Sequence, residues 1–409
     1  MPDRVVITGY GCITPVGLTV EDTWQGLIAG KSGISAISLF DTTSFEVKIA
    51  AEVKGFTAAD HMDANTAKYS DRFTQFAIAA SFQAIKQSKL IIDDTNRYEI
   101  GILLGSGIGG VNTLSQQFAV LNTRGPARVS PFTVPMMIAD NAASRISILT
   151  KIMGPNLCLV SACSTGTDAI GTAYTMIKHG EIQAMIAGGS DAAITPIGVA
   201  GFQQAGALSK NPDPEKASRP FDARRDGFIM GEGSAVVVLE NLDFARQRGA
   251  TILAEVVGYG ATSDANHITQ PSAFGEPAVK AIELALKNIS PEKVDYVNAH
   301  GTSTQLNDLS ETRAIKKVLG EKAYKTPVSS IKSMVGHMLG AAGALEAMVC
   351  CKVVETGVIP PTINLEYPDP ECDLDYVPGK SRTGNINLTI SNSFGFGGHN
   401  SVLAIAKYS

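Results

Sequence analysis

Short runs of apolar and β-branched residues alternate along the chain with longer, alanine-rich stretches. The short runs predict buried strands at 4–9, 100–104, 157–160 and 184–187. The longer stretches predict helices at 22–29, 76–87, 169–179 and 277–287. In the second helix the apolar residues recur at helical spacing, at Phe76, Ala79, Ala80, Ala84 and Ile85. Strands that alternate with helices indicate parallel α/β units.

One strand pattern returns late in the chain. The string RVVITGYG at 4–11 is echoed by AEVVGYG at 254–260, and both are apolar strands that end in Gly-Tyr-Gly. A second series of predicted strands follows the echo, at 294–298, 327–330 and 385–390. The repetition favours two similar halves, 1–250 and 251–409, with the charged segment 241–249 as a connector.

Composition narrows the function classes. The 409 residues are 44% hydrophobic and 18% charged, which is typical of a compact globular enzyme. The formal net charge of -5 disfavours a nonspecific nucleic-acid binder, because such proteins are usually basic. No run of 18 or more apolar residues predicts a membrane span, and the first strand follows the N-terminus without a signal-peptide pattern. We therefore expect a cytoplasmic protein.

The six cysteines are too few for a disulfide framework in a chain of this length, and none forms a CxxC pair with zinc-ligand spacing. A reducing compartment also suits a free catalytic thiol.

A glycine-rich stretch after the second predicted strand, GSGIGG at 105–110, fits a dinucleotide-binding pattern. That reading requires an acidic residue about 20 positions later, and the region contains none. The glycines of 9–11 lack a third glycine, because Thr14 holds that place. Tight strand-to-helix turns explain both stretches better.

Cys163 lies in LVSACSTGTDAIG (159–171), between a predicted strand and a helix that begins near Thr167. The free N–H groups and dipole of a helix N-terminus stabilise a thiolate, so this position would lower the cysteine pKa. The small neighbours leave room for a substrate. The alternative is a buried structural cysteine, the usual fate of free cysteine, and Cys158 on the same predicted strand fits that alternative well.

A cysteine nucleophile needs partners for proton transfer and charge stabilisation. His300 closes the predicted strand VDYVNA, and His337 lies between a strand and a Gly/Ala-rich helix. Both positions are strand ends, where sites in α/β sheets collect, although structural histidines are also common there. Lys332 lies near His337, with surface solvation as the alternative. Glu346 lies in the apolar helix AAGALEAMVCC and therefore requires a cation or hydrogen-bond partner.

Four motifs then coincide in order: SACSTG (161–166), NAHGTST (298–304), SSIKSMVGHMLGAAGALEA (329–347) and SNSFGFGGHN (391–400). With the intervening segments they resemble the elongating β-ketoacyl-acyl carrier protein (ACP) synthases over essentially the whole chain, and the synthase II type of bacterial fatty-acid synthesis most of all. The resemblance implies the thiolase fold, with two similar βα halves in a five-layer αβαβα sandwich, and a homodimer. It also implies decarboxylative condensation of acyl-ACP with malonyl-ACP to 3-oxoacyl-ACP, CO2 and free ACP.

The resemblance assigns roles to residues of this chain. Cys163 would carry the acyl group, and His300 and His337 would donate hydrogen bonds to the malonyl thioester oxygen, with Lys332 tuning their charge state. The N–H groups of Cys163 and Phe396 would form the oxyanion hole, and Phe396 would also act as a gate between Gly395 and Gly397. The substrate contacts implied are Thr302 and Thr304 for the phosphopantetheine arm, Ile108 and Phe202 for the acyl pocket, and Phe132 in the segment 132–138 from the dimer mate.

The same resemblance implies a carrier-protein partner and a bound ion. The carrier is acidic, and the basic residues that could dock it are Lys68, Arg72, Arg124, Arg128 and Lys210. Gly206 stands where family members often carry an arginine, so the patch is thin and binding should be salt-sensitive. No cofactor is required, because 4'-phosphopantetheine is carried by ACP. Some members hold a monovalent cation, Na+ or K+, at the positions of Asn298, Ala299, Glu346, Ser391 and Asn392.

Four alternatives share the fold. A catalytically silent chain-length-factor-like subunit would lack Cys163, and a thiolase or an initiating synthase would lack the second histidine, His337. A polyketide condensing enzyme shares every motif, and only the free-standing length favours fatty-acid synthesis.

Overall fold

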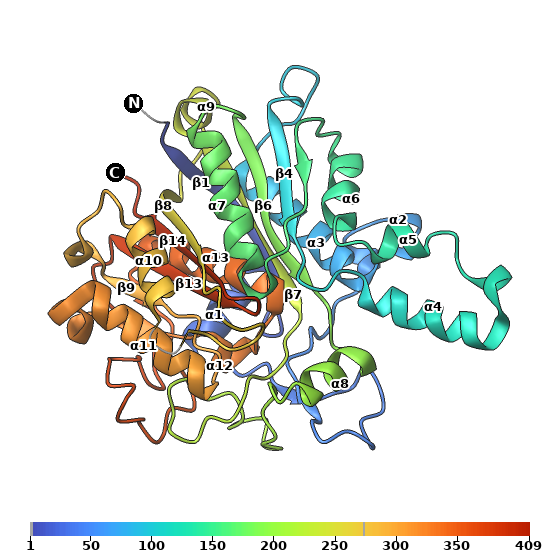
Figure 1. Cartoon of the computed structure of the whole chain (residues 1–409). Helices are drawn as coiled ribbons and strands as arrows, with labels where there is room; N and C mark the ends of the chain where they lie inside the picture. Colours follow the sequence, from blue (N-terminus) through green and yellow to red (C-terminus); the bar gives the residue numbers. More distant parts are fainter. Residues whose placement is uncertain (1–2, 273–274) are drawn as a thin grey trace.

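A single large mixed sheet organises the chain. The computed structural model describes residues 3–272 and 275–409, and within them ten strands pair in the order β10-β9-β13-β14-β8-β1-β7-β6-β4-β5 (Figure 1). These strands are β1 (Val5–Ile13), β4 (Ile100–Gly105), β5 (Asn156–Leu157), β6 (Ala184–Asp191), β7 (Gly233–Asn241), β8 (Ala254–Ser263), β9 (Tyr296–Asn298), β10 (Val328–Ser329), β13 (Leu388–Gly395) and β14 (His399–Ala406). Two short ribbons pair β2 (Ser35–Ala36) with β3 (Ile49–Ala50), and β11 (Val358–Ile359) with β12 (Arg382–Thr383).

Helices connect and cover the strands. The α-helices are α1 (Val20–Ile28), α2 (Ala64–Lys68), α3 (Arg72–Ser88), α4 (Val111–Arg124), α5 (Thr133–Met137), α6 (Asn141–Thr150), α7 (Thr165–Lys178), α8 (Pro196–Gln204), α9 (Leu242–Gln247), α10 (Glu276–Ala285), α11 (Gln305–Leu319), α12 (Lys332–Val335) and α13 (Ala342–Thr356). The 3-10 turns are η1 (Ala58–Asp60), η2 (Pro126–Arg128), η3 (Ala162–Ser164), η4 (Pro291–Lys293), η5 (Gly320–Lys325) and η6 (Leu339–Ala341). No helix within the described ranges is both long and apolar enough to cross a membrane.

The two ends of the sheet repeat one topology. The order β5-β4-β6-β7-β1 on one side matches β10-β9-β13-β14-β8 on the other. In each group the first three strands are parallel and the last two pairings are antiparallel. The groups join where β1 pairs with β8. The parallel units predicted from the sequence are present in each group, but the whole sheet is mixed, because β7 and β14 run antiparallel to their neighbours.

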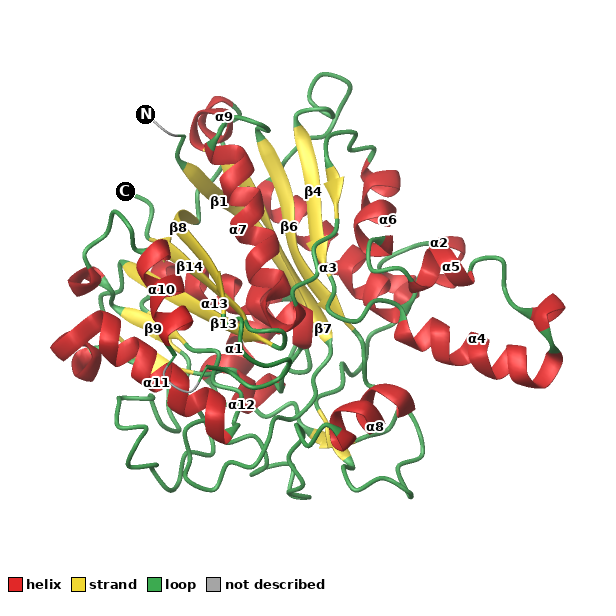
Figure 2. Ribbon diagram, viewed as in Figure 1, coloured by secondary structure: helices red, strands yellow, loops and turns green. Residues whose placement is uncertain are grey.

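The helices complete five layers. Helix α3 packs on β1, β6 and β7 from one side, and α10 packs on β8 and β14. Helices α7 and α13 pack on each other, and each contacts strands of both groups, which places them in the middle layer. Figure 2 shows α7 running beside β6 on the near side of the sheet, with α3 on the far side of the strands. The order of layers is that of the predicted αβαβα sandwich.

The Gly-Tyr-Gly echo marks the closest helix–strand contacts. A Cβ at Gly9 or Gly11 in β1 would overlap the carbonyl oxygen of Ala84 or Ala80 in α3. In β8, a Cβ at Gly258 would overlap the Ala285 carbonyl oxygen of α10 in the same way. Glycine at these positions lets α3 and α10 approach their strands at equivalent places in the two groups.

Two local predictions are wrong around the nucleophile. Of the predicted strand 157–160 only Leu157 is in a strand, the short β5 (Asn156–Leu157), because this segment forms the sheet edge and pairs on one side alone. Cys158 is therefore half-buried rather than part of the core. Helix α7 begins at Thr165, two residues earlier than expected, and is preceded by the turn η3.

Candidate active site

Cys163 lies in the middle of η3, in a turn fixed from both halves of the sequence. Ala162 has a left-handed φ of 50°, which bends the chain sharply before the cysteine. The Ser164 hydroxyl contacts the carbonyl oxygens of Ser393 and His399 at 3.1 Å each, which ties the turn to the hairpin of β13 and β14. A Cβ at Gly395 would lie 3.1 Å from the Cys163 nitrogen, so only glycine lets this hairpin approach so closely.

The Cys163 thiol is a poor acid in the free protein. Burial raises its pKa to about 11, against the opposing effects of the Phe396 backbone N–H and the Lys332 ammonium. The expectation of a lowered pKa at the N-terminus of α7 is therefore wrong, because desolvation of the thiol outweighs the nearby N–H groups and the Lys332 charge. The backbone N–H groups of Phe396 and Cys163 both oppose this rise, so two donors lie close to the sulfur, as an oxyanion hole beside it would require.

His337 presents one nitrogen to the site. Its Nδ1 accepts the backbone N–H of Leu339 at 3.2 Å, so the proton of the neutral ring is on Nε2. This Nε2 is buried and has no partner among the described residues. Burial, and then the Lys332 charge, hold the pKa of His337 well below its usual value, so the ring is a neutral donor at physiological pH.

His300 follows β9 and stands at right angles to His337, with ring centroids 5.4 Å apart. The backbone N–H groups of His300 and Gly301 donate to the two carboxylate oxygens of Glu311 at 2.8 Å. The Nδ1 of His300 lies 3.3 Å from the Lys332 ammonium. Burial, followed by the charge of Lys332 and the neighbouring His337, keeps the pKa of His300 well below its usual value.

Lys332 is buried rather than solvated. Its ammonium forms an ion pair with Glu346, which gives that carboxylate the partner expected from its apolar helix. Burial nevertheless raises the pKa of Glu346, with Lys332 opposing the change. The pair places a fixed positive charge behind His300, and this charge favours the neutral forms of both histidines.

A pocket of about 470 Å³ joins these groups. Among its lining residues are seven of the candidate site residues: Cys163, Phe202, His300, Thr302, Thr304, His337 and Phe396. The structure also brings in residues that sequence reasoning missed, among them Asp264, Thr269 and Asn400. The Asn400 amide donates to Asp264 at 2.7 Å, so these residues hold the 264–270 loop against the β13–β14 hairpin.

Two predicted acyl-pocket residues lie outside this pocket. Ile108 is partly exposed on the loop between β4 and α4, which is the strand-to-helix turn expected for GSGIGG. Phe132 caps α5 and contacts the ring of Tyr69, with centroids 4.0 Å apart. Within one chain neither residue reaches Cys163 through the pocket.

The predicted docking cations differ in availability. Lys68, Arg124, Arg128 and Lys210 are exposed, and Lys210 pairs with Glu46 at 2.8 Å. Arg72 is not available, since its guanidinium donates to both oxygens of the fully buried Glu232 at 2.6 and 2.9 Å. Arg124 and Arg128 lie at the end of α4, which projects from the body on the side away from α11 (Figure 1).

Two buried carboxylates that sequence reasoning missed hold the site loops. Asp191, at the end of β6, accepts hydrogen bonds from Ser106, Gly107, Ile108 and Gly340. Burial raises its pKa to about 6. Burial likewise raises the pKa of Glu311, beneath His300, to about 7. The available signal was a carboxylate at the end of an apolar strand or on a buried helix face, as for Glu346.

Comparison with known proteins places this geometry in a family. The β-ketoacyl synthase N-terminal domain matches residues 2–245, and the C-terminal domain of the same family matches 253–366. The chain belongs to the β-ketoacyl synthase family. It is 52% identical to the 3-oxoacyl-[acyl-carrier-protein] synthase 2 of Synechocystis sp. and 48% identical to that of Coxiella burnetii, in both cases over 99% of this chain and 98% of the relative.

Solved synthase structures share the whole fold. A β-ketoacyl synthase from Burkholderia phymatum superposes with a TM-score of 0.92 at 35% identity, over all of both chains. A ketosynthase solved with its type II polyketide acyl-carrier protein superposes equally well, with a TM-score of 0.92 at 32% identity over all of both chains. The thiolase fold expected from the sequence motifs is therefore confirmed.

Proposed function

We propose that this β-ketoacyl synthase condenses acyl-ACP with malonyl-ACP in fatty-acid elongation, giving 3-oxoacyl-ACP, CO2 and free ACP. The observation that carries the proposal is the single pocket shared by Cys163, His300 and His337 with the Phe396 backbone. Near-50% identity to synthases named for this reaction favours fatty-acid elongation over the polyketide role of the ketosynthase described above.

The reaction proceeds in two half-steps. The Cys163 sulfur attacks the acyl thioester, its proton passes to the departing pantetheine thiol, and the N–H groups of Cys163 and Phe396 stabilise the oxyanion. Malonyl-ACP then loses CO2, while His300 and His337 donate hydrogen bonds to the thioester oxygen that gains charge. The resulting carbanion attacks the acyl-Cys163 carbonyl, and the C–S bond breaks to restore the thiolate. Each residue thus acts at the atom where charge develops.

Replacement of the nucleophile tests the assignment. Cys163→Ala should abolish acyl transfer and condensation but retain decarboxylation of malonyl-ACP, because both histidine donors remain. Intact-protein mass spectrometry would follow the acyl-enzyme, and CO2 release would follow decarboxylation. A Cys158→Ala variant is the matched control and should still become acylated at Cys163. Elongation by the Cys163→Ala protein would refute the mechanism.

We infer a homodimer from exposed apolar surface at one end of the sheet. Strand β5 has an unpaired edge, and around it lie exposed Ile148, Met153, Leu157 and Val160. Exposed edges and contiguous apolar patches indicate association. A second copy on this face would also cover the nearby exposed residues of α5 and supply Phe132 to the partner's site. Leu157→Asp should shift the mass measured by light scattering from dimer to monomer.

A monovalent cation fits a group of buried oxygens beside the site. Glu346 Oε2, Asn298 Oδ1, Ser391 Oγ and Asn392 Oδ1 are buried without a partner among the described residues, and Asn298 lies opposite Ser391 in the sheet. One carboxylate with neutral oxygens suits Na+ or K+. We propose that these residues, with the Ala299 backbone, hold such an ion, which would stabilise the buried Glu346 charge. Crystals grown in a rubidium salt should show an anomalous peak there.

The carrier protein is expected to dock through the exposed cations Lys68, Arg124, Arg128 and Lys210. No cofactor bound to this chain is needed, since the carrier brings its own phosphopantetheine thiol. A cytoplasmic location would suit the six unpaired cysteines. Arg128→Glu should raise KM for ACP substrates and leave kcat unchanged. An unchanged KM would remove Arg128 from the docking surface.

A further inference from the structure

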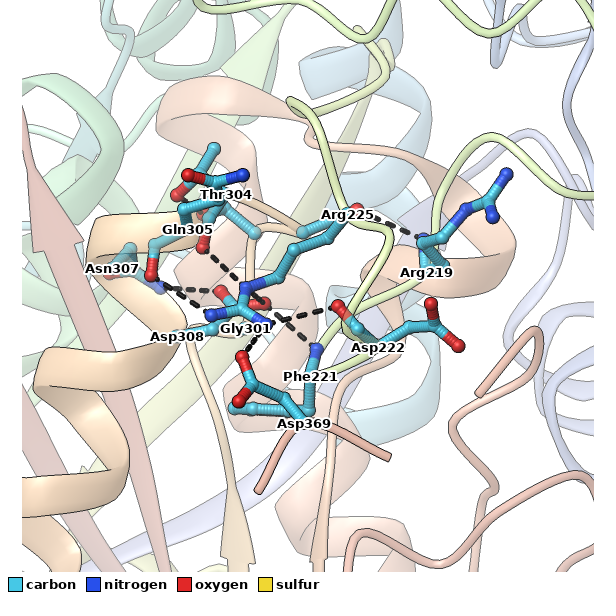
Figure 3. Close-up of polar contacts among 12 residues, drawn as sticks. Arg219, Phe221, Asp222, Arg225, Gly301, Thr304, Gln305, Asn307, Asp308 and Asp369 are labelled. Atoms are coloured by element: carbon cyan, nitrogen blue, oxygen red, sulfur yellow. Dashed lines mark hydrogen bonds and ion pairs between the residues drawn. The ribbon is translucent and has the colours of Figure 1, made fainter. Parts of the chain in front are cut away.

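Arg225 is a buried cation that the mechanism does not use. It is only 4% exposed and lies in the segment 219–228 of the N-terminal half, before β7. Its guanidinium reaches into the C-terminal half, to the residues that begin helix α11 (Figure 3). A buried guanidinium needs several acceptors to offset its lost hydration, so its partners indicate what it holds in place.

The guanidinium binds the backbone of one wall of the pocket. Arg225 Nε donates to the Thr304 carbonyl oxygen at 3.1 Å, and Nη2 donates to the Gln305 carbonyl oxygen at 3.1 Å. On its other side Nη1 donates to the Asp369 carboxylate at 2.6 Å and to the Asp222 carbonyl oxygen at 3.0 Å (Figure 3). The fork thereby fixes the direction of the Thr304–Gln305 backbone, which a point charge could not do.

Other contacts join the same two segments. The backbone N–H of Arg219 donates to the Ser303 hydroxyl at 3.0 Å, and that of Gly227 donates to the Ser303 carbonyl oxygen at 3.0 Å. The Phe221 N–H donates to Asp308 at 2.9 Å, and Asp308 lies 3.6 Å from Arg225 Nε. Ser303 itself has a left-handed φ of 69°, a conformation that these contacts must hold in place.

The wall held in this way carries the two threonines that face the pocket. The hydroxyls of Thr302 and Thr304 lie 2.8 Å apart, so one donates to the other and the pair retains a free donor and free lone pairs. Such a pair suits the amide groups of an extended arm. Asp226, Gly227 and Phe228, which directly follow Arg225 in the chain, line the same pocket.

We propose that Arg225 is a positioning residue for the substrate arm: its fork sets the spacing between the Thr302–Gln305 wall and the 226–228 wall, and so the recognition of pantetheine-linked thioesters. This inference rests on the proposed function, because the threonines contact the arm only if the pocket receives one. Arg225 touches neither Cys163 nor the histidines in any contact described above, so the chemistry of a short thioester should not depend on it.

The test compares substrates that differ in the arm. Acylation of Cys163 is measured by intact-protein mass spectrometry with an acyl-CoA, which carries the whole pantetheine arm, and with an N-acetylcysteamine thioester, which carries only its end. Arg225→Lys keeps the positive charge near Asp308 and Asp369 but loses the fork. It should raise KM for acyl-CoA by about tenfold or more with a small change in kcat, and leave kcat/KM for the short thioester within about threefold.

Controls separate the outcomes. Arg248→Gln removes another partly buried guanidinium, which binds the fully buried Glu240 far from the pocket, and should lower thermal stability without discriminating the two substrates. Thr302→Ala should mimic the loss of arm recognition. Equal losses on both substrates, or full activity of Arg225→Lys, would overturn the inference. A wild-type protein that acylates from neither thioester would instead overturn the proposed function, independently of Arg225.

Discussion

His337 should supply one transition-state hydrogen bond that is measurable in isolation. In a Cys163→Ala background, where only decarboxylation remains, the further change His337→Ala removes the free Nε2 donor. The donor is preorganised, because Leu339 N–H fixes the ring through Nδ1 at 3.2 Å and burial excludes competing water. One such donor contributes about 3 to 4 kcal/mol, so CO2 release from malonyl-ACP should slow by about 10² to 10³-fold.

The pH profile tests the charge state behind this reasoning. Burial and the Lys332 charge depress the pKa of His337, so the neutral donor form predominates above that depressed pKa and is lost only as the pH falls below it. Decarboxylation should therefore stay flat from about pH 6 to about pH 8. A rate that falls as the pH rises through about 6.5 would mean a charged imidazolium donor and would refute the assignment. His179→Ala, an exposed histidine at the end of α7, is the matched control and should leave the rate unchanged.

Three further outcomes follow from the same structure. Alkylation of Cys163 by iodoacetamide should accelerate by about tenfold per pH unit up to about pH 10, because burial raises the thiol pKa to about 11, and a plateau below pH 8 would contradict this. Gly258→Ala should lower the free energy of unfolding in urea by about 1–3 kcal/mol, because the new methyl group would overlap the Ala285 carbonyl oxygen. Gly201→Ala, with open space around the new methyl group, is the control and should not destabilise the fold. Arg72→Gln should lower stability by about 3 kcal/mol yet leave KM for ACP unchanged, and a raised KM would return Arg72 to the docking surface.

Placement at predicted strand ends suggested that Cys163, His300 and His337 could converge, but not the geometry in which they meet. Their proximity depends on the pairing of β1 with β8, which joins two similar groups of strands and has no local sequence signal. Phe396 was reached only through resemblance to a family, because its role resides in a backbone N–H that every residue has. Sequence periodicity reports the burial of elements, and not which loop covers which.

Quantities that depend on burial were the least predictable. The N-terminus of α7 was expected to acidify Cys163, yet desolvation raises the thiol pKa instead. Arg72 looked like a surface cation in DANTAKYSDRF, and its partner Glu232 is 160 residues away in the sequence. No sequence pattern indicated the role of Arg225, because its acceptors are mostly backbone carbonyl oxygens, which every residue has. In each case the deciding neighbour comes from a distant segment.

The repeated topology also explains why the nucleophile and a histidine donor meet. Cys163 lies in η3 immediately before α7, and His337 lies two residues before η6, which leads into α13 at the equivalent place in the other half. The two helices approach through glycines: a Cβ at Gly166 of α7 would lie 2.6 Å from the Ala344 nitrogen of α13, and one at Gly343 would overlap Thr167. Because neither glycine can accept a side chain without separating the helices, their N-termini are held together, and the turns before them form one site. The glycines that end SACSTG and HMLGAAG are therefore as much a requirement of the chemistry as the sulfur and the imidazole.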